Sequence, residues 1–470
     1  MMSRRILAVL CTASIIGCLH ARAEDTLDVP ARFDEVVGKG NAAVAELVAA
    51  LQGPQANRAA AALGRIGSPQ AVAALLPLAA SPEGEMRATV AWALGSCKDP
   101  AATPALLKLA EDPHAPARAG AFWALGRVGN LKSADALRRG TRDPDRNVRL
   151  ALARGIAEGG QKAFFSVLTP RLDYDARWVL EPGEDGKIKE GQKPVEKVFW
   201  TEPDTAVRLA IVQALGTLGV IDAAPSIIYA MEREASFNRL ACVAAIESFG
   251  PKAAGACLGR IVPTPYDKDA FDRRMPLLIN NGTLAVIAGR LGDKRCVPYL
   301  LKTLKLPQGA LGRDKDLTEL YIQTVELLGG YKVEQAARPL AEMLKTTRVG
   351  QLSKALQAAL LAIGRPAARP LARNADDWSL APVFMPLLRE PALRTRTVRD
   401  TLVKFLAHES DEVRREATDT LGLYIYEGVL DQYDIPLLEG MYLDPDRSVR
   451  QVCAKWKNKI AEKFGEGSVK

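Results

Sequence analysis

The chain has 470 residues, of which 48% are hydrophobic but only 6% aromatic, and its formal net charge is +8. A charge this small on a chain of this length excludes the dense basic surface that nucleic-acid binding requires. No run approaches roughly 18 consecutive apolar residues, so we predict that the mature chain has no transmembrane helix.

Residues 1–23 have the three parts of a secretory signal peptide. Arg4 and Arg5 form a basic start, residues 6–19 are mainly apolar, and residues 21–23 (Ala-Arg-Ala) form a cleavage site with small residues on both sides. Cleavage there removes three arginines and no acidic residue, which lowers the net charge from +8 to +5. We therefore predict an exported protein of the bacterial periplasm or cell envelope.

Residues 15–18 (Ile-Ile-Gly-Cys) allow a second interpretation of the same segment. They resemble a bacterial lipobox, in which Cys18 would be lipidated and become the new N-terminus. The protein would then be an outer-membrane lipoprotein anchored through Cys18, and the sequence leaves both routes open.

After a linker and cap at residues 24–40, a regular pattern occupies residues 41–172. Leu63, Leu94, Leu125 and Ile156 follow one another at intervals of 31 residues. A fixed period of this size is typical of stacked repeats, because one short helix pair cannot bury its own apolar face without neighbours. We predict an all-α fold, an α-solenoid of stacked antiparallel helix pairs that forms one extended body.

The repeat is clearest after Asp112. We expect Asp112 to cap the first helix, Pro113 to occupy its first position, and Gly126 and Gly129 to end it. The second helix begins near a proline, which is Pro104, Pro225 or Pro298 in three repeats; Pro104 and Pro225 lie ten residues after the repeat leucine.

An arginine lies six residues after the leading polar residue of most repeats. We expect it to reach the carboxylate of the adjoining repeat, so that the arginines form a structural ladder along the array. These arginines are Arg87, Arg118, Arg149, Arg208, Arg239, Arg414 and Arg450.

Residues 173–205 interrupt the repeats with a polar insertion. Two short apolar arms flank an Asp-Gly turn, which predicts a β-hairpin. Its aromatic residues Trp178, Phe199 and Trp200 are candidates for binding a protein partner, because aromatic side chains dominate interface hot spots. The alternative is that they hold the hairpin against the solenoid.

Repeats continue over residues 206–459 and become less regular after residue 263, and residues 460–470 form a tail. We predict a basic cap helix over residues 446–464. Residues expected on the second helices, and hence on the inner face of the curve, are Lys108, Tyr229, Lys302 and Lys305. They are candidates for binding an acidic protein or peptide, and an ordinary solvated face is the alternative.

The repeat resembles the HEAT repeat, including the short form named after the phycobilisome lyases. The Asp/Arg spacing, the Ala-Leu-Gly ending and the later proline carry this resemblance, which extends over about residues 41–459. The resemblance implies an armadillo-like helical solenoid that binds proteins.

We find no catalytic constellation. His114 and His408 are far apart, and no metal-ligand spacing includes them. A HEAT-repeat family of di-iron hydroxylases uses several His-Glu pairs, whereas this chain has only His408-Glu409. We therefore predict no cofactor, no metal and no catalysis. A lyase-like or hydroxylase-like HEAT enzyme is an alternative.

Five cysteines follow the predicted signal peptide, and no two of them form a C-x-x-C motif. We expect them to be small buried apolar residues, with a pairing of Cys242 and Cys257 as the alternative.

Together these observations predict a non-catalytic interaction scaffold or adaptor of the cell envelope. It would bind another protein or peptide through the concave face or the insertion. A regulatory or assembly subunit of an envelope complex is an alternative.

Overall fold

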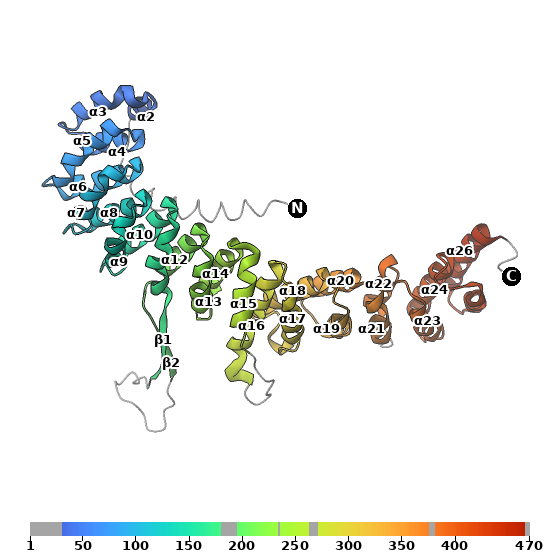
Figure 1. Ribbon diagram of the computed structural model, residues 1–470. Helices are drawn as coiled ribbons and strands as arrows, with labels where there is room; N and C mark the ends of the chain where they lie inside the picture. Colours follow the sequence, from blue (N-terminus) through green and yellow to red (C-terminus); the bar gives the residue numbers. More distant parts are fainter. Residues whose placement is uncertain (1–30, 180–194, 234–235, 263–270, 376–380, 466–470) are drawn as a thin grey trace, which may run out of the picture. The chain divides into compact units, whose positions relative to one another are not determined.

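The computed structural model describes residues 31–179, 195–233, 236–262, 271–375 and 381–465. The chain divides into two compact units, Met1–Phe249 and Gly250–Lys470, and each is a stack of helix pairs (Figure 1). The predicted signal peptide, including Cys18, lies outside the described residues. Within the described ranges, no helix is long and apolar enough to span a membrane.

The helices of the first unit are mostly paired as a long first helix and a shorter second one. They are α2 (Ala31–Gly38), α3 (Val44–Ala50), α4 (Ala56–Ile66), α5 (Pro69–Leu75), α6 (Gly84–Cys97), α7 (Thr103–Leu109), α8 (Ala115–Val128), α9 (Ala134–Gly140), α10 (Arg146–Gly159), α11 (Phe165–Leu168), α12 (Thr205–Leu218), α13 (Ala224–Met231) and α14 (Ser236–Ser248).

The second unit repeats this arrangement with longer and less uniform helices. They are α15 (Ala253–Arg260), α16 (Phe271–Arg290), α17 (Val297–Thr303), α18 (Lys315–Gly330), α19 (Ala337–Thr346), α20 (Gly350–Ile363), α21 (Arg365–Ala375), α22 (Ala381–Leu388), α23 (Arg399–Leu406), α24 (Asp411–Tyr426), α25 (Ile435–Gly440) and α26 (Arg447–Phe464).

The residues with the 31-residue period form the core of the first unit. Leu63, Leu94, Leu125 and Ile156 are all fully buried, and the first helices α4, α6, α8 and α10 pack in succession. The predicted all-α solenoid is therefore confirmed. Gly126 lies inside α8, where a Cβ atom would come within 2.6 Å of the backbone nitrogen of Ile156. Only glycine allows this close approach of two helices.

The start of the repeat differs from the prediction. Helix α8 begins at Ala115 with His114 as its N-cap, so Pro113 lies outside the helix. Asp112 does not cap α8; its Oδ1 accepts a hydrogen bond from the backbone N–H of His114 at 2.8 Å. The prediction that Gly126 ends the helix is also wrong, because the left-handed C-cap is Gly129, with φ of 71°.

The insertion is the predicted hairpin. Strands β1 (Tyr174–Val179) and β2 (Val195–Trp200) pair antiparallel, with Tyr174 opposite Trp200 and Trp178 opposite Glu196. The turn between them, residues 180–194, lies outside the described residues.

The second unit ends in the predicted basic cap helix, α26, which buries Val449, Cys453, Trp456 and Ile460 along one stripe. The expected burial of the cysteines holds for Cys242, Cys257, Cys296 and Cys453, whereas Cys97 is only partly buried. Cys242 and Cys257 do not form the alternative disulfide. Burial raises the pKa of the Cys296 and Cys453 thiols to about 11, so these thiols are protonated at neutral pH.

Candidate functional site

The repeat arginines join neighbouring repeats through bidentate ion pairs. Arg118 donates from Nε to Asp143 Oδ2 at 2.8 Å and from Nη2 to Asp143 Oδ1 at 3.1 Å. Its Nη1 donates to the carbonyl oxygens of Asp112 and Pro113 at the start of its own repeat. The same pattern joins Arg87 to Asp112, Arg149 to Glu202 and Arg414 to Asp444.

The ladder changes where the hairpin interrupts the array. Glu202 follows β2, is fully buried, and accepts hydrogen bonds from both Arg149 and Arg171. Arg208, the next repeat arginine, donates to the carbonyls of Glu202 and Pro203 and lies over the Trp200 ring, 4.4 Å from its centroid. Glu202 therefore joins the helix before the hairpin to the repeat after it.

Hydrogen bonds from arginine also set the acidity of the ladder carboxyls. The Arg87 side chain holds the pKa of Asp112 below its ordinary value, and Arg414 does the same for Asp444. Partial burial opposes both shifts, but the charge-assisted bonds outweigh it. Asp112 and Asp444 are therefore ionised at neutral pH.

Trp200 and Tyr229, two candidates for partner binding, pack at the base of the hairpin. Tyr174 of β1 stacks on Tyr229 of α13 with centroids 4.3 Å apart, and its ring meets that of Trp200 edge-on at 5.1 Å. The Tyr229 hydroxyl donates to the Tyr174 carbonyl at 3.3 Å. These two aromatic residues hold the hairpin on the solenoid.

Phe199 of β2 pairs with Asp175 of β1, and its side chain is 50% exposed. The guanidinium carbon of Arg177 lies 5.9 Å from its ring centroid. The side chain of Trp178 lies outside the described part of the chain, so only its pairing with Glu196 is placed. Of the three predicted hairpin aromatics, Phe199 is the one that offers a described exposed surface.

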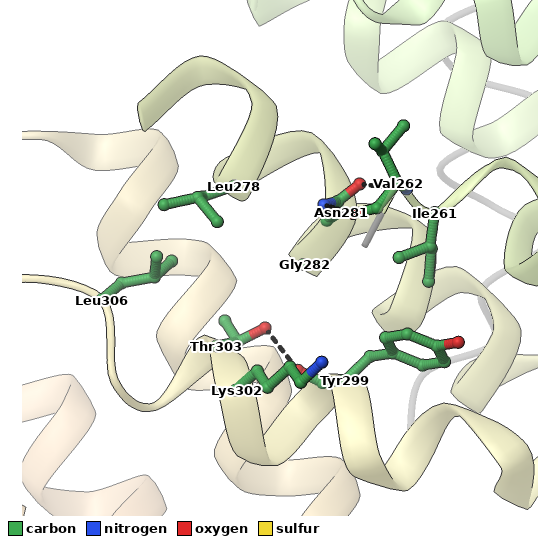
Figure 2. Close-up of a pocket in the computed structure, with 9 residues that line it drawn as sticks. All are labelled: Ile261, Val262, Leu278, Asn281, Gly282, Tyr299, Lys302, Thr303 and Leu306. Atoms are coloured by element: carbon green, nitrogen blue, oxygen red, sulfur yellow. Dashed lines mark hydrogen bonds between the residues drawn. The ribbon is translucent and has the colours of Figure 1, made fainter. Parts of the chain in front are cut away.

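A pocket of about 130 Å³ lies in the second unit between the end of α15, the middle of α16 and α17 (Figure 2). Ile261, Leu278 and Leu306 provide apolar walls. The Asn281 side chain accepts from the Val262 N–H at 3.2 Å and donates to the Val262 carbonyl at 2.9 Å, which fixes the backbone at the mouth.

Helix α16 approaches its neighbours closely beside the pocket. A Cβ atom at Gly282 would lie 3.0 Å from Thr303 Oγ1 and 3.0 Å from a methyl group of Leu320, so the small residue permits the approach of α16 to its neighbours. The Thr303 hydroxyl donates to the Tyr299 carbonyl at 3.1 Å and is thereby satisfied within α17. The pocket therefore presents mainly apolar surface.

Lys302, a candidate from the sequence, lines this pocket, with its ammonium 5.8 Å from the centre of the Tyr299 ring. Lys305 lies just after α17 and is exposed. Lys108 is also exposed and belongs to α7 in the first unit. The apolar pocket was missed, and a glycine inside the long helix α16 was the only signal for it.

His408 has a structural role in the described contacts. Its Nδ1 accepts the backbone N–H of Ser410 at 2.9 Å, and its carbonyl accepts a bond from Arg414. Within the described residues, no group of three or more His, Cys, Asp and Glu side chains is placed to hold a metal ion.

Comparison with known proteins identifies repeats in the first unit. The family model described as HEAT repeats matches residues 44–124 and 103–181. A search of curated proteins finds no match. Among solved structures, the complex of CpcE and CpcF of phycocyanin lyase from Nostoc sp. PCC7120 is 20% identical and covers 55% of this chain and 90% of that one, with a TM-score of 0.29.

Two further solved structures are similar over more of the chain. The karyopherin Kap121p is 11% identical, with 100% of this chain and 55% of that chain covered and a TM-score of 0.39. Importin beta is 14% identical, with 92% and 56% covered and a TM-score of 0.34. The chain thus spans about half the length of each of these two proteins. The family match places HEAT repeats at residues 44–181, and the stacked helix pairs of the described residues form an all-α solenoid.

Proposed function

We propose that the protein is a non-catalytic interaction scaffold of the cell envelope and that the pocket beside Lys302 holds a segment of a partner protein. The observation that carries this proposal is an apolar pocket of about 130 Å³ with a lysine on its lining. An apolar side chain of the partner would enter between Leu278 and Leu306, and a carboxylate next to it would pair with Lys302.

The size of the pocket supports a single side chain as its occupant. An apolar cavity of about 150 Å³ accommodates a benzene molecule, so this pocket suits one leucine, isoleucine or phenyl group. Because Asn281 fixes the mouth and Thr303 is internally bonded, binding needs little rearrangement of the walls. Preformed pockets of this kind lower the entropic cost of binding.

The cell envelope enters the proposal through the signal peptide predicted at residues 1–23, with lipidation at Cys18 as the alternative route. Export is tested by fractionating cells that express the full chain and by mass spectrometry of the mature N-terminus. A mature chain beginning at Glu24 would indicate ordinary cleavage, and a lipidated Cys18 would indicate an anchor. Full-length protein in the cytoplasm would contradict the envelope role.

The pocket is tested by affinity capture of envelope proteins with the intact protein and two variants. Leu278→Asp places a charge on the apolar wall, and Lys302→Glu reverses the charge on the lining. Both should lose a partner that the intact protein retains. Lys354→Glu, an exposed lysine on α20, is the matched control and should retain it. A partner held equally by all four proteins would rule out the pocket.

The hairpin is a second candidate because Phe199 is half exposed on a strand that the solenoid supports. Phe199→Ser should then lose the partner while Leu278→Asp keeps it. If Leu278→Asp loses the partner and Phe199→Ser keeps it, the pocket is the binding site. A partner that gains or loses enzymatic activity on capture would favour the reading of a regulatory or assembly subunit.

A further inference from the structure

The four complete ladder arginines share one hydrogen-bond geometry. In each, Nη1 donates to the two carbonyls that lie six and five residues earlier, and this holds the guanidinium in one orientation. Nε and Nη2 then donate side by side to a carboxylate of the following repeat, over distances of 2.6–3.1 Å. The carbonyl bonds thus preorganise an edge that binds a carboxylate.

Arg450 in α26 makes the same two bonds to backbone carbonyls. Its Nη1 donates to the Asp444 carbonyl at 2.6 Å and to the Pro445 carbonyl at 2.8 Å. Among the described residues, no carboxylate forms an ion pair with it. Arg414 directs its Nε–Nη2 edge toward Asp444 of the repeat that follows, so Arg450 directs the same edge toward the side on which a further repeat would stack.

The surroundings of Arg450 are apolar and basic. Arg450, Lys457 and Phe464 are seven residues apart and therefore share a face of α26. Leu443, just before α26, is 89% exposed, and Tyr442 is exposed with its ring 5.3 Å from the Lys457 ammonium. Exposed apolar side chains next to an oriented guanidinium edge give this face the mixed character of an interaction site.

We propose that this end of the second unit is a docking surface for an acidic segment of a partner polypeptide. An aspartate or glutamate of the partner would bind the Nε–Nη2 edge of Arg450 through two parallel hydrogen bonds, and an apolar side chain beside it would cover Leu443. Lys457 adds a second positive charge. The proposal rests on the scaffold function but is independent of the pocket beside Lys302.

A polypeptide carboxylate is the occupant because the chain itself uses one at every complete position of the ladder.

The probe is a synthetic peptide with the sequence of residues 441–464, because this segment presents Asp444 to Arg414 within the chain. Its affinity for the intact protein is measured by isothermal titration calorimetry, beside a peptide with Asp444→Asn. The proteins compared are the intact chain, Arg450→Lys, and Lys459→Ala as a control on an exposed part of α26. Arg450→Lys keeps the positive charge but removes the bidentate edge.

We expect the peptide to bind the intact protein and the Lys459→Ala variant equally, and the Arg450→Lys variant at least tenfold more weakly. The Asp444→Asn peptide should also bind the intact protein at least tenfold more weakly than the unchanged peptide does. The Arg450→Lys variant should bind the two peptides with equal affinity, because the interaction between the arginine and the carboxylate is already lost. Binding that is independent of residue 450, or no binding at millimolar peptide, overturns the proposal. Self-association of the intact protein that Arg450→Lys abolishes, measured by sedimentation, would overturn the choice of occupant. If the capture experiment shows that the pocket beside Lys302 binds no partner, the peptide affinities measured here still test the docking surface around Arg450.

Discussion

Glu202 shows how much one side chain contributes to the array. Its carboxylate is fully buried, and it bonds Arg149 at 2.9 and 3.0 Å and Arg171 at 3.2 Å. A buried carboxylate between two arginines is costly to neutralise, because both cations then lose their partner.

We predict that Glu202→Gln lowers the free energy of unfolding by about 3 kcal/mol. Urea unfolding followed by circular dichroism measures the change. Glu158→Gln, which removes an exposed carboxylate paired with Arg127, should change stability by less than about 0.5 kcal/mol. Equal effects of the two substitutions would contradict the role assigned to Glu202.

The ladder also predicts a dependence on pH. The pKa values of Asp112 and Asp444 are depressed in the folded chain, chiefly by hydrogen bonds from Arg87 and Arg414. Their stabilising effect is therefore fully present above the unfolded pKa of about 3.9 and is lost as the pH falls through the lower folded values.

The double variant Asp112→Asn/Asp444→Asn should accordingly be less stable than the intact protein at pH 7, and the difference should shrink as the pH falls below about 4. Unfolding free energies measured across this range test the sign. If the difference in unfolding free energy between the two proteins stays constant below pH 4, protonation of these two carboxyls is not linked to unfolding.

The spacing of residues predicted that each repeat arginine pairs with a carboxylate of the next repeat, but it did not predict the other hydrogen bonds of these carboxylates. The interval of six residues indicated that arginine reaches the next repeat, and Arg118 does so. The role of Asp112 as a helix cap was wrong because Asp112 instead accepts the His114 N–H while it receives Arg87. Nothing in the local pattern distinguishes these two uses of one carboxylate.

Among the elements, the hairpin depends on a few aromatic contacts for its attachment to α13. The Tyr174–Tyr229 stack and the Tyr174–Trp200 contact are its main described anchors. Aromatic pairs contribute about 0.5–1.5 kcal/mol beyond the area that they bury.

We predict that Tyr229→Ala speeds amide hydrogen exchange in β1 and β2 by roughly tenfold, which corresponds to about 1.4 kcal/mol. Exchange in α8 should not change. Phe199→Ala serves as the control, because this half-exposed ring is not part of the anchor. Unchanged exchange in the strands of the Tyr229→Ala variant would show that other contacts hold the hairpin.

Element types were easier to predict than the pocket. A period of 31 residues specifies which residues face inward, and the Asp-Gly turn between two apolar arms indicated the strands. The pocket beside Lys302 arises where α15, α16 and α17 depart from the regular repeat, and no periodic pattern describes such a departure. Lys302 was predicted because it occupies the same position in its second helix as Lys108 and Tyr229 do in theirs. No sequence pattern pointed to Leu278 or Leu306.

For the whole molecule, the sequence predicted one extended body, and the contacts within the structure group the chain into two compact units, Met1–Phe249 and Gly250–Lys470. In a solenoid each repeat contacts its neighbours, so stability is close to a sum of repeat and interface terms. Each compact unit is therefore a candidate for independent folding, whereas α8 and α10 pack against each other inside the first unit.

We therefore predict that residues 24–249 and 250–470, expressed separately, each keep their helical content and unfold cooperatively. Circular dichroism and thermal melting measure both properties. A chain cut after Gly129 is the control, because it separates α8 from α10 and breaks the Arg118–Asp143 ion pair. Its two fragments should lose helicity, since each exposes an apolar helix face that its neighbour covers. If residues 24–249 unfold as readily as the control fragments, the first unit depends on the second, and the division has no thermodynamic meaning.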